Sequence, residues 1–506
     1  MINSSSIKAL SLVTLAAALG CKMEPAEETT PKPNIIVILA DDLGYGDVSA
    51  YGSNTISTPN IDQLAAAGLR FTQGYCTSAT CTPSRYGLLT GVYPWRNKDA
   101  RVLPGDAPAL IRPGMATLPS LLKKAGYKTA VVGKWHLGLG DGNVNWNERI
   151  SPGPNDIGFD YSYMMAATND RVPTVFVENQ RVVGLEAHDP LMINYKENFP
   201  GEPTGKDNPE LLKMHPSHGH DMSIHNGISR IGFMKGGKAA LWRDEDMADV
   251  FVDKAREFMT EQKDGPFFLY FALHQPHVPR TPNERFVGQS GMGPRGDAIV
   301  EADWCVGEIT KHLESLGLSK NTLIVFSSDN GPVIDDGYQD QAVELLGDHQ
   351  PLGPLRGGKY SLFDGGTRVP FIVSWPGKVK AGVSDALVCQ VDLPASLSSL
   401  VGVTADSGTI ADSKNVIDAL LGKSDIGRSS LVLHASGTQA IRNLKWYLIP
   451  PNDGPAIYQY TNTESGRDTA MQLYQISDPG QKINIAAENP EAVAELEALL
   501  LAEKKK

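Results

Sequence analysis

The sequence is poor in cysteine, with only five among its 506 residues. These are Cys21, Cys76, Cys81, Cys305 and Cys389. Such a sparse, odd-numbered set excludes the disulfide framework of a small secreted scaffold. Cys21 and Cys81 stand in motifs that suggest chemistry of their own. We therefore expect the other three to be mostly buried thiols, which behave as small apolar side chains.

Positive charge is also in short supply. The chain has 46 Lys and Arg residues against 58 Asp and Glu residues, a net charge of −12 at pH 7. No basic stripe is visible, so nucleic acid is excluded as a partner. A local cluster of cations can still bind a small anionic substrate. The length favours two domains over one.

The apolar run near the N-terminus is too short to span a bilayer as a helix. It extends from Ala9 to Leu19 and is typical of an export signal. It ends in Leu19-Gly20-Cys21, which resembles a lipoprotein cleavage box with Cys21 as the acylated residue, although Ala18 stands where that box prefers Leu. We expect a signal peptide over 1–20 and a Pro-rich tether over 21–33. The protein is then exported, as a periplasmic, outer-membrane or cell-surface lipoprotein held only by this lipid anchor; an ordinary cleaved signal peptide is the alternative.

Continuous apolar runs alternate with helical patterns over much of the chain, which indicates an α/β fold with a large, mainly parallel central sheet flanked by helices. The expected strands are Asn34–Ala40, Thr129–Gly133, Pro266–Leu273, Thr322–Ser328 and Pro370–Trp375. The expected helices between them are Ile61–Ala67, Leu118–Ala125, Glu245–Glu261 and Ala298–Leu316. After about residue 380 the pattern changes to short alternating strands within Val432–Ile449 and Ala470–Ile476 and a helix over Asn489–Glu503. We expect a main domain over 34–380 and a smaller α+β subdomain with an antiparallel sheet over 381–506.

Four of the expected strands end in charged or metal-binding residues. The ligand-bearing ends are Asp41-Asp42, Lys134 with His136, His274 with His277, and Asp329-Asn330. Because ligands collect at the carboxyl ends of strands in such sheets, these side chains predict one shared polar site. The oxygen donors Asp41, Asp42, Asp329 and Asn330 suit Ca²⁺ or Mg²⁺ rather than zinc. Taken singly, each pair also fits a turn or a helix cap, the lysines fit a solvated turn or loop, and the histidines fit a core or a loop.

The segment Cys81-Thr-Pro-Ser-Arg85 is the most informative motif of the chain. A helical pattern follows it and stops at Gly91, so Cys81 is expected near a helix N-terminus, where backbone N–H groups favour anions. A structural loop cysteine is the alternative. The C-x-P-S-R spacing resembles the signature of the formylglycine-dependent sulfatases, in which this cysteine is oxidised to an aldehyde after synthesis.

Further blocks extend the resemblance from Asn34 to about Asn484. In order they are N-I-I-V-I-L-A-D-D-L-G-Y-G-D, G-K-W-H-L-G, P-H-V-P, S-D-N-G-P and G-G-K-Y-S-L-F-D-G-G-T-R-V-P. The resemblance implies the alkaline-phosphatase-like fold and one Ca²⁺ held by Asp41, Asp42, Asp329, Asn330 and the oxidised Cys81. It also implies a transient partner, the maturase that makes formylglycine. The implied catalytic residues are Cys81, Arg85, Lys134, His136, His277 and Lys359.

The mechanism implied by this resemblance is transesterification. One hydroxyl of the hydrated aldehyde, beside Arg85, attacks sulfur. Lys134 and Lys359 stabilise the charge on the sulfate oxygens. His277, with Lys359, protonates the departing sugar oxygen, and His136 takes a proton from the second hydroxyl to release sulfate.

Three segments between the strands carry residues that suit a sugar. The expected substrate-binding residues are Asp170, Arg171, His220 and Arg356. An Asp–Arg pair can hold adjacent ring hydroxyls, although it also fits a surface ion pair. The histidine-rich segment His215–Asp221 also fits a second metal site, and no role follows for His215, His218, His274 or His349. The blocks N-D-R-V-P and G-P-L-R-G-G-K resemble those of bacterial polysaccharide sulfatases, most closely enzymes acting on 6-O-sulfated galactose or N-acetylgalactosamine.

Two other functions remain open. Phosphonate monoester hydrolases and phosphodiesterases share the implied fold, and some share C-x-P-S-R, so turnover of sulfate against phosphate esters would separate the two. A glycan-binding lipoprotein with a decayed site is a non-catalytic alternative. The sequence argues against the latter, because no expected catalytic position is substituted.

Overall fold

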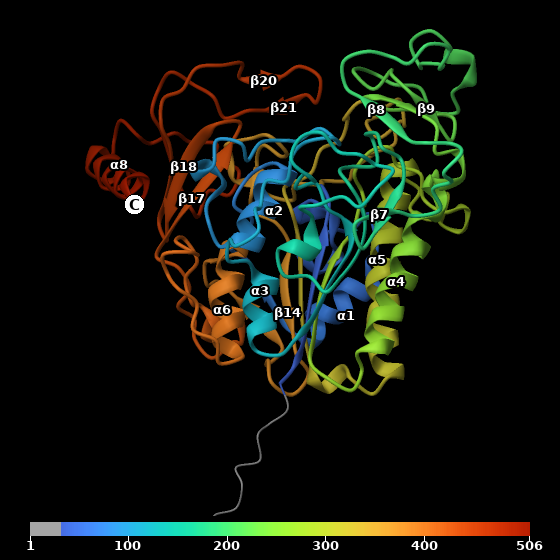
Figure 1. Ribbon diagram of the computed structural model, residues 1–506. Coiled ribbons are helices and arrows are strands. Elements are labelled where there is room, and N and C mark those ends of the chain that lie inside the picture. The colour runs from blue at the N-terminus through green and yellow to red at the C-terminus, as the bar shows by residue number, and fades with distance from the viewer. Residues whose placement is uncertain (1–31) are drawn as a thin grey trace, which may run out of the picture. The chain divides into compact units, whose positions relative to one another are not determined.

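A ten-stranded sheet forms the centre of the structure, a computed structural model that describes residues 32–506 (Figure 1). Its middle consists of five parallel neighbours in the order β13-β1-β12-β4-β5. They are β1 (Asn34–Ala40), β4 (Lys128–Lys134), β5 (Tyr161–Met165), β12 (Phe267–Ala272) and β13 (Thr322–Ser328). The expected mainly parallel sheet is therefore confirmed. The expectations for the signal peptide, Cys21 and residues 21–31 of the tether lie outside the described residues.

Helices cover both faces of this sheet, which explains why its strands are continuous apolar runs. Ile35, Val37 and Leu39 of β1 point into one core with α2 (Cys81–Thr90), α3 (Leu118–Lys124) and α6 (Leu393–Leu400). Ile36 and Ile38 point into a second core with α1 (Pro59–Ala67), α4 (Met247–Glu261) and α5 (Gly293–Ser315). Figure 1 shows the two helix layers on opposite sides of the strands. A strand buried on both faces cannot alternate apolar and polar residues.

The edges of the sheet contain strands of opposite direction. The remaining members are β2 (Leu69–Phe71), β6 (Phe176–Glu178), β7 (Arg181–Val182), β14 (Phe371–Ser374) and β15 (Gly382–Ser384). The strand expected over Pro370–Trp375 is β14, and it runs antiparallel to β13. Its carboxyl end therefore points to the opposite edge of the sheet from those of β1, β4, β12 and β13. An apolar run buried on both faces gives no information on strand direction.

The sheet continues past the domain boundary expected at residues 380/381. β15 pairs with β2, and β16 (Val388–Cys389) pairs with β3 (Gly74–Tyr75), so the chain after residue 380 still belongs to the main body. The separate antiparallel sheet begins only at β17 (Ser430–Ala435). The boundary at 380/381 is thus a correction: the change in sequence pattern precedes the change of sheet, because edge strands and the helix α6 also lack long apolar runs.

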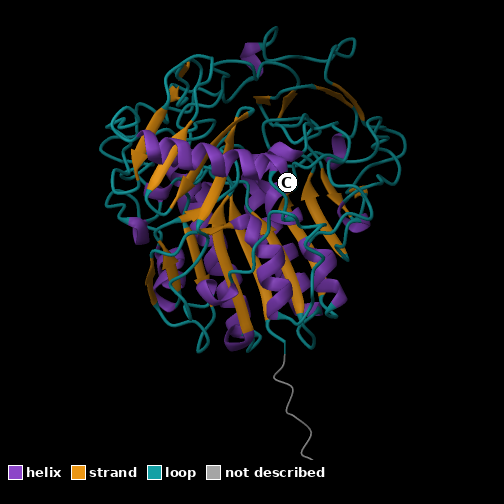
Figure 2. Cartoon of the chain, turned by 90° about the vertical axis from the view of Figure 1, so that its left-hand side faces the viewer, coloured by secondary structure: helices purple, strands orange, loops and turns teal. Residues whose placement is uncertain are grey.

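A four-stranded antiparallel sheet forms the C-terminal part, as expected. Its order is β17-β18-β19-β22, with β18 (Thr438–Asn443), β19 (Trp446–Ile449) and β22 (Gln472–Gln475). Figure 2 shows the last helix, α8 (Pro490–Lys505), lying across these strands. Leu496 and Leu500 of α8 are buried there against Leu448 and Tyr447, among others. The helix expected over Asn489–Glu503 is confirmed.

The remaining elements are short. They are α7 (Ile417–Leu420), β8 (Met192–Asn194), β9 (Ile224–His225), β10 (Ile228–Ser229), β11 (Phe233–Lys235), β20 (Ile457–Tyr458) and β21 (Thr463–Glu464). The segment from β6 to α4 is mostly irregular and lies at the end of the molecule where β1, β12 and β13 finish (Figure 1). Such a segment can shape an opening above the strand ends.

Two further expectations can be compared with residues 32–506. Cys76, Cys305 and Cys389 are free and buried, as expected for thiols that pack as small apolar groups. Over the same range, none of the helices combines the length and apolarity that crossing a bilayer requires.

Candidate active site

The carboxyl ends of four adjacent strands form the base of the site. Asp41 follows β1, Lys134 ends β4, His277 follows β12 and Asp329 follows β13. Because β13, β1, β12 and β4 are neighbours and all parallel, these ends meet at one edge of the sheet. Two backbone hydrogen bonds fix the junction: Asp41 N–H donates to the Gln275 carbonyl at 3.0 Å, and Asp329 N–H donates to the Ala40 carbonyl at 3.0 Å. The predicted convergence of the strand ends is confirmed.

Buried acids and lysines alternate at this edge. Lys134 Nζ donates to Asp41 Oδ2 at 2.5 Å, and Lys359 Nζ donates to Asp42 Oδ2 at 2.8 Å. Asn330 Nδ2 donates to Asp42 Oδ1 at 2.7 Å. All five side chains are buried. Burial raises the pKa of Asp41 despite Lys134, whereas for Asp42 the two lysines outweigh burial and lower its pKa.

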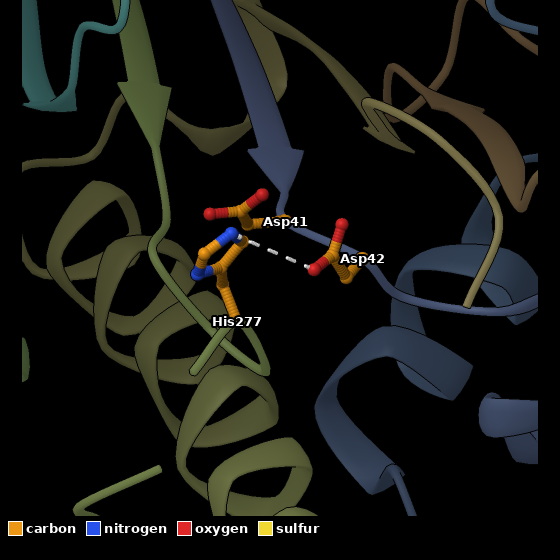
Figure 3. Close-up of side chains that lie close together, drawn as sticks. All are labelled: Asp41, Asp42 and His277. Atoms are coloured by element: carbon orange, nitrogen blue, oxygen red, sulfur yellow. Dashed lines mark ion pairs between the residues drawn. The ribbon is translucent and has the colours of Figure 1, made fainter. Parts of the chain in front are cut away.

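The same edge has the donor atoms of a cation site. One potential ligand atom from each of Asp41, Asp42 and His277 lies within 4.8 Å of the others, and Figure 3 shows the three side chains converging. Asp41 Oδ1 and Asn330 Oδ1 are buried and have no hydrogen-bond partner among the described residues. A buried oxygen without a donor is costly unless something else satisfies it. Carboxylate and amide oxygens suit a hard divalent cation, so these residues fit Ca²⁺.

Cys81 is the first residue of α2, with Thr80 as its N-cap, which confirms the expected position at a helix N-terminus. Its side chain is buried, and burial raises the pKa of the thiol although Lys134 and Lys359 act in the opposite direction. The thiol is therefore protonated at neutral pH, and a protonated thiol is a poor nucleophile. An unmodified cysteine in this position has little reactivity of its own.

Arg85 lies one helical turn after Cys81 and ties α2 to the strand ends. Its Nε and Nη2 lie 2.9 and 2.8 Å from Asp329 Oδ2, and Nη1 donates to the Lys134 carbonyl at 3.0 Å. The guanidinium is fully buried, and Asp329 overcomes that burial and raises the pKa of Arg85 further. Arg85 thus holds Cys81 beside the acids with a permanent positive charge.

Two histidines of the site have one ring nitrogen fixed by a carbonyl. His277 Nδ1 donates to the Val278 carbonyl at 2.7 Å, which leaves Nε2 at 3.8 Å from Asp42 Oδ2. His136 Nε2 donates to the Leu103 carbonyl at 2.9 Å, which leaves its Nδ1 as an unpaired acceptor. Burial and nearby lysines hold the pKa of both imidazoles well below the usual value. Both rings are neutral at pH 7 when no anionic substrate is present.

The substrate-binding candidates from the irregular segment lie together. Asp170 Oδ1 accepts from Arg171 Nη1 at 2.8 Å, and Asp170 Oδ2 lies 3.0 Å from His220 Nε2. Arg171 contributes to the lowered pKa of His136, after burial and Lys134, and Asp170 acts on His277. The three residues therefore form one cluster beside the catalytic candidates. Asp170 and His220 are buried and Arg171 is partly exposed, so the pair is not a free surface ion pair.

Arg356 lies elsewhere, which corrects its assignment as a substrate-binding residue. Its guanidinium donates to Glu464 at 2.6 and 3.1 Å and to the Gln481 carbonyl at 2.9 Å. It also covers the ring of Phe363 at 3.9 Å. Arg356 therefore fastens the C-terminal part to the main body. The spacing between Arg356 and Lys359 in the sequence could not reveal these contacts, because both partners of Arg356 lie more than a hundred residues further along the chain.

The remaining histidines differ in their surroundings. His349 Nε2 donates to Asp47 Oδ1 at 2.7 Å beside Arg295, in a buried ion-pair network. His274 packs against Phe251 of α4, and burial lowers its pKa to about 3. His218 stacks on the exposed ring of Tyr460. Among the described residues, the side chains that could hold a metal together are Asp41, Asp42 and His277, and no such group forms in the His215–Asp221 segment.

Sequence reasoning missed two residues that contact the site. Asp336 Oδ2 accepts from Lys359 Nζ at 2.8 Å, so it shares this lysine with Asp42. Thr168 contacts both members of the Asp170–Arg171 pair through its hydroxyl. For Asp336, the only signal in the sequence was the acidic pair Asp335-Asp336, which follows the S-D-N-G-P block closely. Nothing in the sequence distinguishes Thr168 from other loop threonines.

Comparisons with known proteins agree with this geometry. Residues 33–403 match the family model for sulfatases. Over 492 residues the chain is 50% identical to an N-acetylgalactosamine-6-O-sulfatase of Bacteroides thetaiotaomicron, covering 96% of each chain. It is 32% identical to human arylsulfatase A, covering 93% of this chain and 87% of that protein.

A solved structure described under the metabolism of multiple glycosaminoglycans by Bacteroides thetaiotaomicron superimposes with a TM-score of 0.93 at 51% identity. It covers 94% of this chain and 100% of that chain. The fold is therefore the sulfatase and alkaline-phosphatase-like fold, as expected. Family and geometry lead to the same conclusion: the chain belongs to the sulfatase family and is a sulfuric ester hydrolase.

Proposed function

We propose that the protein hydrolyses the 6-O-sulfate ester of N-acetylgalactosamine or galactose in a glycan. The observation that carries this proposal is the cluster of Asp170, Arg171 and His220 beside the catalytic candidates, in a chain 50% identical to an N-acetylgalactosamine-6-O-sulfatase. Charged side chains of this kind can hold adjacent ring hydroxyls through charge-assisted hydrogen bonds. Such bonds distinguish one hexose from another.

We also propose that Ca²⁺ binds at Asp41, Asp42, Asp329 and Asn330, with residue 81 beside it. The unpartnered oxygens Asp41 Oδ1 and Asn330 Oδ1 support this proposal. When bound, the ion supplies positive charge that stabilises the sulfate oxygens as charge develops on them. Lys134 and Lys359 add to the same field from either side, and Arg85 holds the start of α2 in place.

Position 81 carries formylglycine in this proposal, made from Cys81 by a maturase. The raised pKa of the Cys81 thiol supports it, because a buried neutral thiol is a poor nucleophile, whereas a hydrated aldehyde offers hydroxyls. The sequence C-T-P-S-R provides the core that such a maturase reads.

The proton-carrying groups follow from the ring orientations. Lys359 retains its proton, since Asp336 and Asp42 overcome burial and raise the pKa of this lysine. His277 directs Nε2 into the site; a bound sulfate anion favours the protonated ring, and His277 in this charged form is proposed to work with Lys359 in protonating the departing sugar oxygen. His136 offers Nδ1 as an acceptor, which fits removal of a proton from a hydroxyl at position 81.

A substrate panel tests the proposal. Protein from a host with a maturase is assayed on 6-O-, 4-O-, 3-O- and 2-O-sulfated N-acetylgalactosamine, galactose and glucosamine, and on a phosphonate monoester. We expect preference for the 6-O-sulfated galacto sugars, and no turnover by Cys81→Ser protein that retains the wild-type melting temperature. Preference for the phosphonate, or for a sugar of another configuration, contradicts the proposal.

Peptide mass spectrometry tests the modification separately. Active protein should contain an aldehyde at residue 81, and active material with only the thiol would contradict it. Lipid attached to Cys21, after removal of residues 1–20, would support export as an anchored lipoprotein; a mature N-terminus without lipid would support the ordinary signal peptide.

A further inference from the structure

Asp336 is an acidic residue at the reaction site whose charge takes no direct part in the proposed steps. Its Oδ2 accepts from Lys359 Nζ at 2.8 Å, the same distance at which that ammonium group donates to Asp42 Oδ2. Within residues 32–506, Lys359 is the cation that the Asp336 carboxylate contacts. Because Asp42 already pairs with this buried lysine, the need to neutralise Lys359 does not by itself explain a second carboxylate.

The segment that carries Asp336 is held on both sides. Before it, the buried guanidinium of Arg280 donates to the Ile334 carbonyl at 2.8 Å. After it, the Gly337 carbonyl accepts from the backbone N–H of Ser217 at 2.9 Å. The carboxylate is thus fixed beside the lysine before any substrate arrives. A charge fixed in this way acts on a ligand without reorganising first.

The residue after Asp336 places this segment beside the sugar-binding candidates. Gly337 has a φ of 106°, and a Cβ atom added to it would lie 2.1 Å from the ring of His220. Only glycine permits that approach at this backbone conformation. The segment therefore contacts Lys359 on one side and His220 on the other, and the Asp336 side chain is 12% exposed. Its charge lies within the proposed site and not at an outer rim.

The charge of the ligand changes during sulfate ester hydrolysis. A sulfate monoester carries one negative charge, whereas the inorganic sulfate released from it carries two. A phosphate monoester, which has the same tetrahedral shape, also carries two at pH 8. A fixed carboxylate repels each negative charge on a nearby anion, so it opposes a dianion about twice as strongly as a monoanion.

We propose that Asp336 is a specificity-determining residue, whose charge makes the site accept monoanionic sulfate esters and reject dianions. The dianions rejected in this way are phosphate monoesters, which compete with the substrate, and inorganic sulfate, which is the product. Lys359 keeps one N–H group for an ester oxygen, since the two carboxylates take the other two. The proposal rests on the proposed function in one respect, namely that Lys359 faces the reacting ester.

Binding of two inorganic anions tests this proposal without turnover. Sulfate and sulfamate are both tetrahedral, but at pH 7 sulfate carries two negative charges and sulfamate carries one. Each is titrated by calorimetry into Cys81→Ala protein and into Cys81→Ala/Asp336→Asn protein. Asparagine retains an oxygen that can accept from Lys359 Nζ, so the substitution removes the charge and keeps the shape. We expect the affinity for sulfate relative to sulfamate to rise about tenfold or more in the Asp336→Asn background.

Turnover of three esters with one leaving group tests the same charge effect at the reacting position. At pH 8, 4-nitrophenyl sulfate and methyl 4-nitrophenyl phosphate carry one negative charge each, and 4-nitrophenyl phosphate carries two. All three release 4-nitrophenolate, which leaves without protonation. Asp336→Asn should raise kcat/KM for the dianionic phosphate relative to the sulfate about tenfold or more. The ratio between the two monoanions should stay near its wild-type value. An ester that is not turned over is measured as a competitive inhibitor.

Asp335→Asn is the matched control. The Asp335 carboxylate accepts from Ser217 Oγ at 3.3 Å and lines a neighbouring cavity, so this variant removes the same charge one residue away from the contact with Lys359. It should keep both ratios near the wild-type values. Asp336→Glu retains the charge and should do the same, whereas Asp336→Ala, a second neutral variant, should reproduce the effect of Asp336→Asn. Each variant is first checked for the wild-type melting temperature.

Unchanged ratios in Asp336→Asn and Asp336→Ala overturn the proposal. An equal rise for both phosphorus esters also overturns it, because that result would reveal a change of shape and not of charge. Failure of the sugar panel leaves these ratios untouched, since no sugar takes part in either measurement. Success of the panel with unchanged anion ratios rejects the role of Asp336 alone.

Discussion

Replacing His277 with asparagine tests the proton donor of the proposed reaction. In the structure His277 Nδ1 donates to the Val278 carbonyl at 2.7 Å, and Nε2 faces the acids. Asparagine retains an N–H for that carbonyl but has no atom in the position of Nε2. The substitution therefore removes the proton-carrying nitrogen while keeping the hydrogen bond that fixes the loop.

The expected loss of activity follows from the different roles of the two ring nitrogens. A positioned general acid contributes about 10²–10⁴ in rate, which corresponds to about 3–5 kcal/mol of barrier. A sugar alkoxide is a poor leaving group and needs that proton. A 4-nitrophenolate leaves without protonation, so its sulfate ester should lose less than about tenfold.

The assay measures kcat for both esters with the wild type and His277→Asn, both carrying the modification at residue 81. His274→Asn is the matched control: it makes the same replacement three residues earlier, where the ring packs against Phe251 of α4 and makes no hydrogen bond or ion pair with Asp42 or Lys359 among the described residues. We expect it to retain activity on both esters. Equal losses on both esters in His277→Asn, or no loss on the sugar ester, would refute protonation by this residue.

Three further outcomes are expected. Asp47 is buried and paired with Arg295 at 2.7 Å, which outweighs burial and lowers the pKa of Asp47 to about 2. Its charge thus stabilises the fold fully above the unfolded pKa near 3.8, and this contribution is lost as pH falls toward 2. Asp47→Asn should lower the free energy of unfolding at pH 7 by about 2–4 kcal/mol in urea denaturation; an unchanged midpoint would show that the pair contributes nothing. Burial raises the pKa of Glu301 to about 7, so its contribution is greatest below pH 4.5 and declines by about 3 kcal/mol as pH rises through 7. Glu301→Gln should therefore flatten the change in melting temperature between pH 5 and pH 8, and an unaltered pH dependence would contradict this. Chelation by EGTA should lower both activity and melting temperature, because Asp41 Oδ1 and Asn330 Oδ1 lose the cation that satisfies them, and Ca²⁺ should restore both; indifference to EGTA and Ca²⁺ would count against the metal.

The strands that carry the site were predictable nearly to the residue. Asn34–Ala40 and Thr322–Ser328 are β1 and β13 with the expected bounds, since a strand covered by helices on both faces is a plain apolar run. The helix expected over Ala298–Leu316 begins earlier, at Gly293. Its start was missed because Gly293 and Pro294 are residue types typical of a turn. The direction of β14 was not predictable, because the pattern of apolar residues does not show whether a strand pairs parallel or antiparallel with its neighbour.

The side-chain partners were predictable only where strand ends fixed them. Asp41 and Lys134 stand at the carboxyl ends of β1 and β4, the parallel strands on either side of β12, so the topology brings them to the same edge of the sheet, where they are in contact. Arg356 and Asp336 belong to irregular chain, and their partners Glu464 and Lys359 come from separate segments. In an irregular segment, the position of a residue near a motif does not predict where its side chain points, since a loop side chain can point either way.

The sequence by itself determined the sheet, the strand ends and the chemistry-bearing residue types that gather there, because burial and strand polarity act locally along the chain. Only the tertiary structure decided which carboxylate faces which lysine, and which nitrogen of His136 and of His277 is bound to a backbone carbonyl. These depend on distances of a few ångströms between segments hundreds of residues apart. At that scale, in a low-dielectric interior, the interaction energy of two charges changes steeply with the distance between them.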